Sequence, residues 1–304
     1  MFVNAAAQSA LATLRSINES IETTANRIAT GRTVNGAADD PTYWSITAEM
    51  RSDIGAVNTV LDSLAVGRAQ LATADAGLAS AYESLVEIQS LLVSAQSSGA
   101  DRASLQSDID GYITSLQNVA DSAQLNDFNY LSVDSSAAGY NATVQVVGSF
   151  SSTSAGVTIT TIDVDRTDTA LIDPAGGTAA GILDQDRTVG GTTDSVMNID
   201  ISALTDSATD MTTLSELSSI VDAALTDVIA AQSTIGIALN RTDNQITYLQ
   251  ALNDAKELAV SSLVDANVEE EAAKLTALQT QQQLAVEALS IANGQASYVL
   301  RLLA

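Results

Sequence analysis

Apolar residues recur at one fixed interval of seven along the first third of the chain. A seven-residue repeat kept over many turns makes helices supercoil around each other. A helix from about residue 42 to 98 is ~85 Å long at 1.5 Å per residue, which is more than a compact domain needs. The repeat therefore predicts a helical rod with a core formed by Met50, Val57, Leu64, Leu71, Leu78, Leu85 and Leu92.

Shorter apolar stripes at helical spacing occupy both ends of the chain, and the run Glu269-Glu270-Glu271 predicts the start of the last helix. These stripes predict that the N- and C-terminal segments together form a long coiled-coil rod. The stripe near the N-terminus comprises Leu11, Leu14, Ile17, Ile21 and Ile28, and the stripe near the C-terminus comprises Leu275, Leu278, Leu284, Val286, Leu289, Ile291, Val299, Leu300 and Leu303.

The amino-acid composition changes between about residues 129 and 210, where Gly, Thr, Ser and Asp dominate. β-Branched residues at 144–147 and 157–165 predict short strands, and the glycine-containing stretches 174–177 and 189–191 predict turns. The predicted fold class is therefore mainly α, with a small β-rich insertion between two helical ends.

The segment 26–44 is the most irregular part of the N-terminal third. Gly31 can adopt a positive φ angle and Pro41 disfavours the α conformation at Asp40, so one helix should end near residue 30 and the next should start at Pro41. A metal or acid–base role for Asp39 and Asp40 would need further ligands or a cleft. Capping of the second helix needs nothing more, and we predict that role.

Composition narrows the function further. The chain has 304 residues with 37 acidic and 12 basic side chains, and its net charge of −25 opposes binding to nucleic acids and anionic bilayers. His and Cys are absent, which excludes disulfides, Cys nucleophiles, Ser-His-Asp triads and His or Cys metal ligands. Asp163, Asp165 and Asp168 lack the Gly and Glu of a calcium loop. We expect no enzyme activity and no cofactor.

The sequence shows neither a membrane span nor a signal peptide by its apolar runs. No uninterrupted apolar run approaches the ~18 residues of a membrane span, so we expect no membrane insertion. The first 20 residues have no basic start before Arg15 and no apolar core of a signal peptide. A secreted protein of this sequence would need a route without a cleaved signal.

Three segments resemble the bacterial flagellin family, of the α-proteobacterial type. They are NRIATGRTVNGAADDPTYWSIT at 26–47, QLNDFNYLS at 124–132 and QQQLAVEALSIANGQASYVLRLL at 281–303. The resemblance covers all but the middle of the chain. It implies a subunit that self-assembles into the helical flagellar filament used for swimming, exported unfolded and ordered on assembly. The implied partners are further copies, the export apparatus, an export chaperone, the filament cap and hook-junction proteins, and the implied location is extracellular.

The resemblance also implies a domain layout. Residues 1–32 and 266–304 would form the innermost helical domain, 33–140 and 211–265 the rod, and 141–210 a small outer region, with the terminal stripes as the self-assembly interface. The charge agrees with this layout. Residues 1–32 carry three bases and two acids, and 266–304 carry two bases and four acids, which totals −1 and leaves −24 on the rest.

Many flagellins are sensed by an animal receptor through a helix motif that reads Arg-Val-Arg-Glu-Leu. The matching stretch here is 87–91, where Glu87, Gln89 and Ser90 replace the charged motif residues. The resemblance therefore implies poor recognition. Two alternative functions stay open at this point, a hook–filament junction protein and a free secreted coiled-coil binding module.

Overall fold

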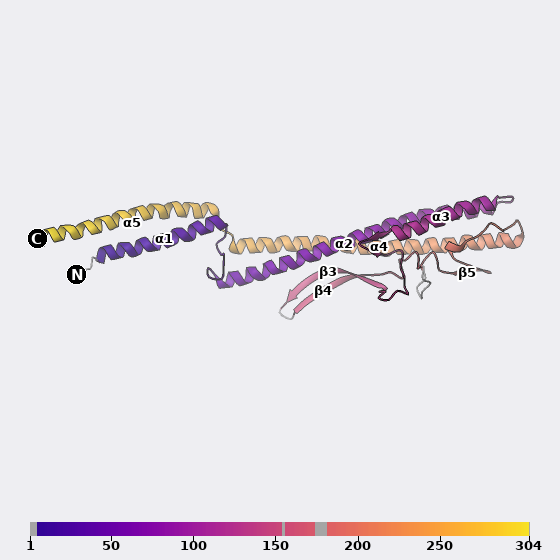
Figure 1. Ribbon diagram of the computed structural model, residues 1–304, viewed down its shortest axis with the longest axis horizontal. Helices are drawn as coiled ribbons and strands as arrows, with labels where there is room; N and C mark the ends of the chain where they lie inside the picture. The colour runs from indigo at the N-terminus through magenta and orange to yellow at the C-terminus, as the bar shows by residue number, and fades with distance from the viewer. Residues whose placement is uncertain (1–4, 154–155, 174–180, 304) are drawn as a thin grey trace. The chain divides into compact units, whose positions relative to one another are not determined.

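The structure is a computed structural model that describes residues 5–153, 156–173 and 181–303 (Figure 1). Long helices dominate it, which confirms the predicted mainly α fold class with a small β insertion. The helices are α1 (Ala5–Thr30), α2 (Pro41–Ala95), α3 (Arg102–Ser122), α4 (Ala208–Val264) and α5 (Val268–Leu303). α1 ends at residue 30 and α2 starts at Pro41, as the irregular segment predicts.

The chain forms two compact units. The terminal unit comprises residues up to 55 together with residues from 253 onward, and the central unit comprises residues 56–252. The unit limits fall inside α2 and α4, whereas the predicted domain limits follow the turns between helices.

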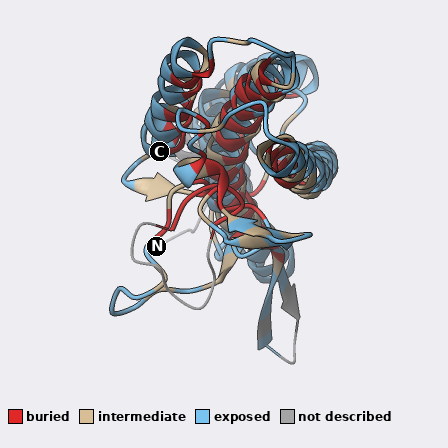
Figure 2. Cartoon of the chain, turned by 90° about the vertical axis from the view of Figure 1, so that its right-hand side faces the viewer, coloured by how far each residue is buried: buried red, intermediate tan, exposed pale blue. Residues whose placement is uncertain are grey.

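The central unit has one apolar core formed by α2, α3, α4 and the insertion between α3 and α4. Six members of the seven-residue series are completely buried there, so a repeat visible in the sequence becomes the main ridge of the core. In Figure 2 the buried residues gather on the sides of helices that face one another. The six residues are Val57, Leu64, Leu71, Leu78, Leu85 and Leu92.

α2 and α4 run antiparallel within the central unit. Arg68 near the start of this part of α2 forms an ion pair with Asp243 late in α4, with 2.5 Å between Nε and Oδ1. Arg102, the first residue of α3, pairs with Asp206, just before α4, with 2.7 Å between Nη2 and Oδ1. Each end of the helix pair is thus held by one ionic contact, while the apolar core between them supplies most of the stabilisation.

Three two-stranded antiparallel sheets make up the strands of the described insertion. β1 (Gln124–Leu125) and β2 (Phe128–Asn129) form a tight hairpin, β3 (Thr143–Thr153) pairs with β4 (Gly156–Asp165), and β5 (Arg187–Val189) pairs with β6 (Thr192–Asp194). A short 3-10 helix, η1 (Val196–Asn198), follows. The strands predicted at 144–147 and 157–165 and the turn at 189–191 are confirmed. The turn predicted at 174–177 lies outside the described residues.

The insertion packs on α2 at two glycines. A Cβ atom on Gly67 would lie 2.5 Å from Cγ1 of Val146, and one on Gly77 would lie 2.5 Å from Cδ1 of Leu131. Both distances are far shorter than a van der Waals contact, so a larger residue at either position would force Val146 or Leu131 to shift. The insertion is therefore part of the central core, with Leu131, Leu171, Leu183 and Ile201 each completely buried.

α4 is the one described helix that is long and apolar enough, by length and composition alone, to cross a membrane. Its mean hydropathy reaches 1.4 over 18 residues, of which 33% are buried. This average arises although charged and polar residues interrupt every apolar run of the helix. One face of α4 belongs to the central core, through residues such as Leu214, Val228 and Ile235.

Candidate self-assembly surface

The terminal unit consists mainly of α1 and α5, which lie side by side and antiparallel (Figure 1). Nε2 of Gln282 donates a hydrogen bond of 2.6 Å to Oδ1 of Asn18. Nη1 of Arg27 lies 3.3 Å from Oε1 of Glu271. The partner of the earlier residue in α1 lies later in α5, and the two residue numbers of each pair add up to nearly the same value. This is the pattern of two helices that run antiparallel.

Backbone hydrogen bonds join the two turns that lead into this helix pair. The amide of Thr33 donates to the carbonyl of Val264 at 2.7 Å, and the amide of Ala266 donates to the carbonyl of Gly31 at 2.9 Å. Gly31 has a φ angle of +69°, the left-handed conformation that ends α1 and that glycine adopts without strain. The α1–α2 and α4–α5 connections therefore form one short two-stranded bridge.

The predicted terminal stripes are only partly covered in this unit. Leu14, Ile17, Ile21, Ile28, Leu275, Leu278 and Leu289 are half-buried along the α1–α5 seam. Four others are exposed, with exposed fractions of 39% for Leu11, 63% for Leu284, 52% for Val286 and 61% for Ile291. Val299, Leu300 and Leu303 lie outside the residues whose side chains the structure describes.

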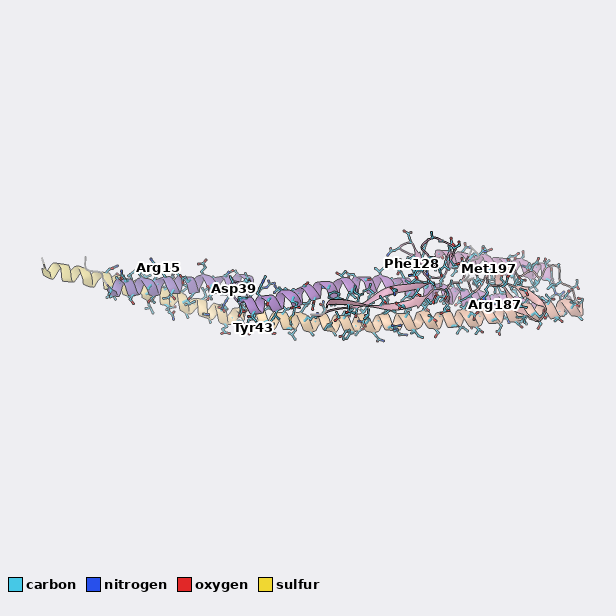
Figure 3. The ribbon with its side chains drawn as sticks, turned by 90° about the horizontal axis from the view of Figure 1, so that it is seen from below. Arg15, Asp39, Tyr43, Phe128, Arg187 and Met197 are labelled. Atoms are coloured by element: carbon cyan, nitrogen blue, oxygen red, sulfur yellow. The ribbon has the colours of Figure 1, made fainter. Side chains whose placement is uncertain are left out.

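A two-helix pair leaves much of its apolar surface in water. The buried residues of the described parts of α1 and α5 are polar, Thr24 and Glu271, and no apolar side chain there reaches the same burial. Beside Leu11 the seam opens into a hollow of about 490 Å³, lined also by Arg15, Leu289 and Asn293; Arg15 is labelled in Figure 3. These exposed apolar side chains make the terminal unit the candidate surface for binding another molecule.

Glu271 at the start of α5 has an ion-pair partner that the sequence does not predict. The acidic run does start α5, because Oδ1 of Asn267 accepts hydrogen bonds from the amides of Glu269 and Glu270, at 3.2 and 3.4 Å. Glu271, however, turns inward, is 8% exposed and meets Arg27. The signal was weak, since only pairing of the two chain ends brings position 27 near position 271.

The capping prediction for the two aspartates before α2 holds for one of them. Oδ1 of Asp40 accepts hydrogen bonds from the amides of Thr42 and Tyr43, at 2.9 and 3.0 Å, which caps α2. Oδ2 of Asp39 instead accepts from the amides of Asn35 and Gly36 and holds the preceding turn. Asp39 and Tyr43 lie close together at the start of α2 (Figure 3).

Met50 departs from the other members of the seven-residue series. It is half-buried and packs on a separate small cluster in the terminal unit, whose buried members are Val34, Val260 and Val264. Trp44 packs on the same cluster. The reason is that the first turns of α2 face the turn at 31–40 and the end of α4 rather than the central core.

The ionisable groups of the central unit serve the fold. Burial raises the pKa of Tyr130 to about 12. Burial also raises the pKa of Asp184, although the amide of Asp173 donates to that carboxylate. Asp165 accepts from the amide and hydroxyl of Thr167, as an ordinary turn residue does. Among the described residues no group of three His, Cys, Asp or Glu side chains could hold a metal ion.

The predicted receptor-motif residues lie on one stretch of α2 in the central unit. Glu87 and Ser90 are exposed, and Gln89 is half-buried with its Oε1 buried and unpartnered. Ile88, between them, belongs to the core. The three motif positions therefore share one helix stretch that is anchored by a buried neighbour.

The fold and the terminal seam define a mainly helical structural protein whose chain ends pair and expose apolar side chains. Comparison with known proteins agrees with this class. The profile of the bacterial flagellin N-terminal helical region matches residues 3–135, and that of the bacterial flagellin C-terminal helical region matches residues 218–303. The chain belongs to the bacterial flagellin family, as the sequence resemblance predicts, and it is of the α-proteobacterial type.

Full-length relatives support the assignment. Flagellin C of Rhizobium meliloti (strain 1021) is 35% identical, over 99% of this chain and 98% of that protein. Flagellin A of the same strain is 33% identical over 99% of each chain. The flagellin of Brucella melitensis biotype 1 is 32% identical, over 99% of this chain and 98% of that protein. Flagellins are structural filament proteins, and the flagellum is an extracellular appendage.

A solved structure shares the fold. It is a putative flagellar hook-associated protein from Vibrio parahaemolyticus, with a TM-score of 0.53 and 15% sequence identity, and the match covers 75% of this chain and 100% of that one. At this identity the likeness concerns the fold alone. The alternative of a hook–filament junction protein gains no support from it.

Proposed function

We propose that this chain is the repeating subunit of a swimming filament, and that its terminal unit becomes ordered only when further copies cover it. The observation that carries the proposal is the exposure of apolar side chains on the side of α5 that faces away from α1, where Leu284 and Ile291 are more than half exposed. Ordering a residue costs ~1–2 kcal/mol in backbone entropy alone, which a two-helix pair of this kind offsets poorly. Contacts with neighbouring copies supply the missing burial.

The charge distribution supports the same layering. Residues 1–32 and 266–304 total −1, while the remaining residues total −24. Segments that pack densely around a common axis repel one another strongly if each brings several like charges. We therefore assign 1–32 with 266–304 to the innermost layer, 33–140 with 211–265 to the rod, and 141–210 to the outer surface.

Export follows from weak terminal order. A chain whose ends lack a core of their own can pass unfolded through a narrow channel and fold after it joins the growing tip. The partners in this scheme are the flagellar export apparatus, an export chaperone, the hook-junction proteins and the filament cap. Secretion without a cleaved signal peptide belongs to the same proposal.

Deletion of residues 285–304 tests the proposal. The truncated chain should keep the helical circular dichroism of the central unit and fail to form filaments in electron micrographs. Leu284→Asp and Ile291→Asp should act in the same direction, since each places a charge on the exposed apolar side of α5. Gln283→Asp, at an exposed polar position of the same helix, is the matched control. Normal filaments from the truncated chain would overturn the proposal.

The receptor motif is a second, separate part of the proposal. Glu87 reverses a charge in the Arg-Val-Arg-Glu-Leu pattern, and Gln89 and Ser90 remove two more. We expect a weak response in cells that report on the animal receptor. A Glu87→Arg, Gln89→Arg, Ser90→Glu variant should raise the response, and full potency of the unmodified protein would contradict this expectation.

A further inference from the structure

The outward side of α4 in the central unit differs in charge from the rest of the molecule. Between residues 228 and 252 the chain contains one acidic residue, Asp243, and one basic residue, Arg241, in a protein of net charge −25. Asp243 is held by Arg68. Arg241 is exposed, and within the described chain it has no carboxylate at ion-pair distance. This stretch therefore presents a single unpaired positive charge.

The same side of α4 carries large exposed apolar side chains. The exposed fractions are 58% for Ile237 and 60% for Tyr248. Ile237, Arg241 and Tyr248 follow one another at helical spacing on one face. We call Ile237, Arg241 and Tyr248 the α4 ridge.

A groove of matching chemistry lies between α2 and α3. It consists of two adjoining hollows of about 540 and 530 Å³ that share Glu87, Tyr112 and Ser115. Tyr82 and Val86, which are 38% and 40% exposed, add apolar surface to its wall. We call this the α2–α3 groove.

The groove is acidic where the α4 ridge is basic. Its lining carries Glu83, Glu87 and Asp108, all three exposed. The lining contains no residue of α4, so groove and ridge are two separate surfaces of the central unit. Tyrosine rings next to carboxylates are well suited to hold a guanidinium group, through cation–π contact and charge.

A polymer of unlimited length needs two different surfaces that bind each other, because a surface that binds only itself closes into a dimer. We propose that the α4 ridge of one copy docks in the α2–α3 groove of a neighbouring copy, with Arg241 facing Glu83 and Glu87. This inference rests on the proposed filament function and identifies one pair of surfaces that joins its subunits.

A second copy fits the ridge better than a lipid surface does. A chain of charge −25 is repelled by anionic bilayers, and the acidic groove gives the lone arginine an opposite charge on the same protein. An arginine in the middle of the ridge also opposes deep insertion into hydrocarbon. Vesicle binding is therefore treated as an opposing outcome of the test.

Charge reversal tests the contact in the full-length protein. Arg241→Glu and Glu87→Arg should each raise the critical concentration for polymerisation about tenfold, since each places like charges opposite one another. The double variant should recover most of the loss, because the pair is then restored with opposite orientation. Light scattering gives the critical concentration, and electron microscopy verifies that the product is a filament.

Two controls keep the result interpretable. Asp62→Arg makes the same change of charge as Glu87→Arg, at an exposed position of α2 outside the groove, and should leave the critical concentration unchanged. Thermal melts of all variants should coincide, because every altered side chain is exposed. Arg241→Lys should stay within about threefold of the unmodified protein, since the charge is kept.

The outcomes separate the two proposals. If the unmodified protein forms no filaments, the proposed function fails. If it forms filaments and the single reversals have no effect, or the double variant recovers nothing, the ridge–groove contact is wrong while the filament function stands. Binding of the unmodified protein to phosphatidylcholine vesicles that Ile237→Glu abolishes would also overturn the contact.

Discussion

The two units use the same helical pattern to different degrees. In the central unit the apolar residues at seven-residue spacing are completely buried against α3, α4 and the insertion. In the terminal unit the stripes of α1 and α5 meet only each other, and several of their members remain exposed. The comparison teaches that an apolar stripe makes a finished core only when enough elements surround it. A stripe that packs against a single partner helix leaves apolar surface exposed, and we propose that further copies cover it.

Charge follows the same division. The residues assigned to the innermost layer total −1 and the remainder totals −24. In the proposed layering, the segments to be buried in the polymer are therefore almost neutral, and the segments that face water are strongly negative.

The largest expected effect compares one leucine from each unit. Leu78→Ala should lower the free energy of unfolding of the central unit by about 2–5 kcal/mol, because it leaves a cavity in a closed core. Leu284→Ala should change the stability of the monomer by less than ~0.5 kcal/mol and impair assembly instead. Denaturant unfolding followed by circular dichroism measures both. Equal losses from the two substitutions would break the comparison.

A smaller effect is expected at the contact between the insertion and α3. Nε2 of Gln106 donates to the carbonyl of Ile199 at 2.9 Å, and its Oε1 accepts from the amide of Ile201 at 2.8 Å. Gln106→Ala would strand both buried backbone groups and should cost about 1–3 kcal/mol in the same unfolding experiment. Gln117→Ala, at an exposed position of α3, should be neutral. Similar values for the two variants would contradict the structural role of Gln106.

The rate of polymerisation should depend on ionic strength, because the regions outside the terminal segments carry nearly all the negative charge. Polymerisation should be severalfold slower at ~0.01 M than at ~0.1 M salt, because the Debye length falls from ~30 to ~10 Å and screens repulsion between the −24 regions. Turbidity after seeding measures the rate. A rate that falls steadily as salt is added would show that attraction between charges dominates assembly.

The smallest expected effect is the acid sensitivity of the central unit. The hydrogen bond from Arg102 lowers the pKa of Asp206 below its ordinary value of 3.8. Because folding lowers the pKa of Asp206, its carboxylate stabilises the folded state above about pH 4. This stabilisation is lost as pH falls through the lowered pKa. Asp206→Asn should therefore flatten the loss of stability on acidification.

Asp184 provides the opposite sign. Burial raises the pKa of Asp184, so the folded state favours its protonated form. The free energy of unfolding therefore declines as pH rises through that raised pKa. Asp184→Asn should remove this decline. Urea unfolding midpoints measured between about pH 3 and pH 7, a range that includes the ordinary pKa values of carboxyl groups, test both variants. Identical pH profiles for the two substitutions would contradict the assignment.

The sequence predicts the helices well and the long-range pairs poorly. The interval of seven places Leu64, Leu71 and Leu78 on one face whatever lies opposite, so their burial follows from local geometry. Leu171, Leu183 and Ile201 are equally buried, but they lie in apolar stretches of one to three residues among Gly, Asp and Ser, where no period marks a core position.

Contacts between distant residues depend on tertiary structure. Arg27 and Glu271, or Gln106 and Ile199, meet only because helices that are far apart in the sequence lie side by side. The terminal stripes were predictable as apolar surfaces. Which of their members are covered was not, since that depends on how α1 and α5 pack against each other.

Hydrogen exchange on the monomer and on the filament tests the central claim most directly. Amides of residues 5–30 and 268–294 should exchange rapidly in the monomer and become protected in the filament. Amides of α2 and α4 in the central unit should be protected in both states, because their core is already closed. Strong protection of both terminal helices in the monomer, unchanged on polymerisation, would contradict the account.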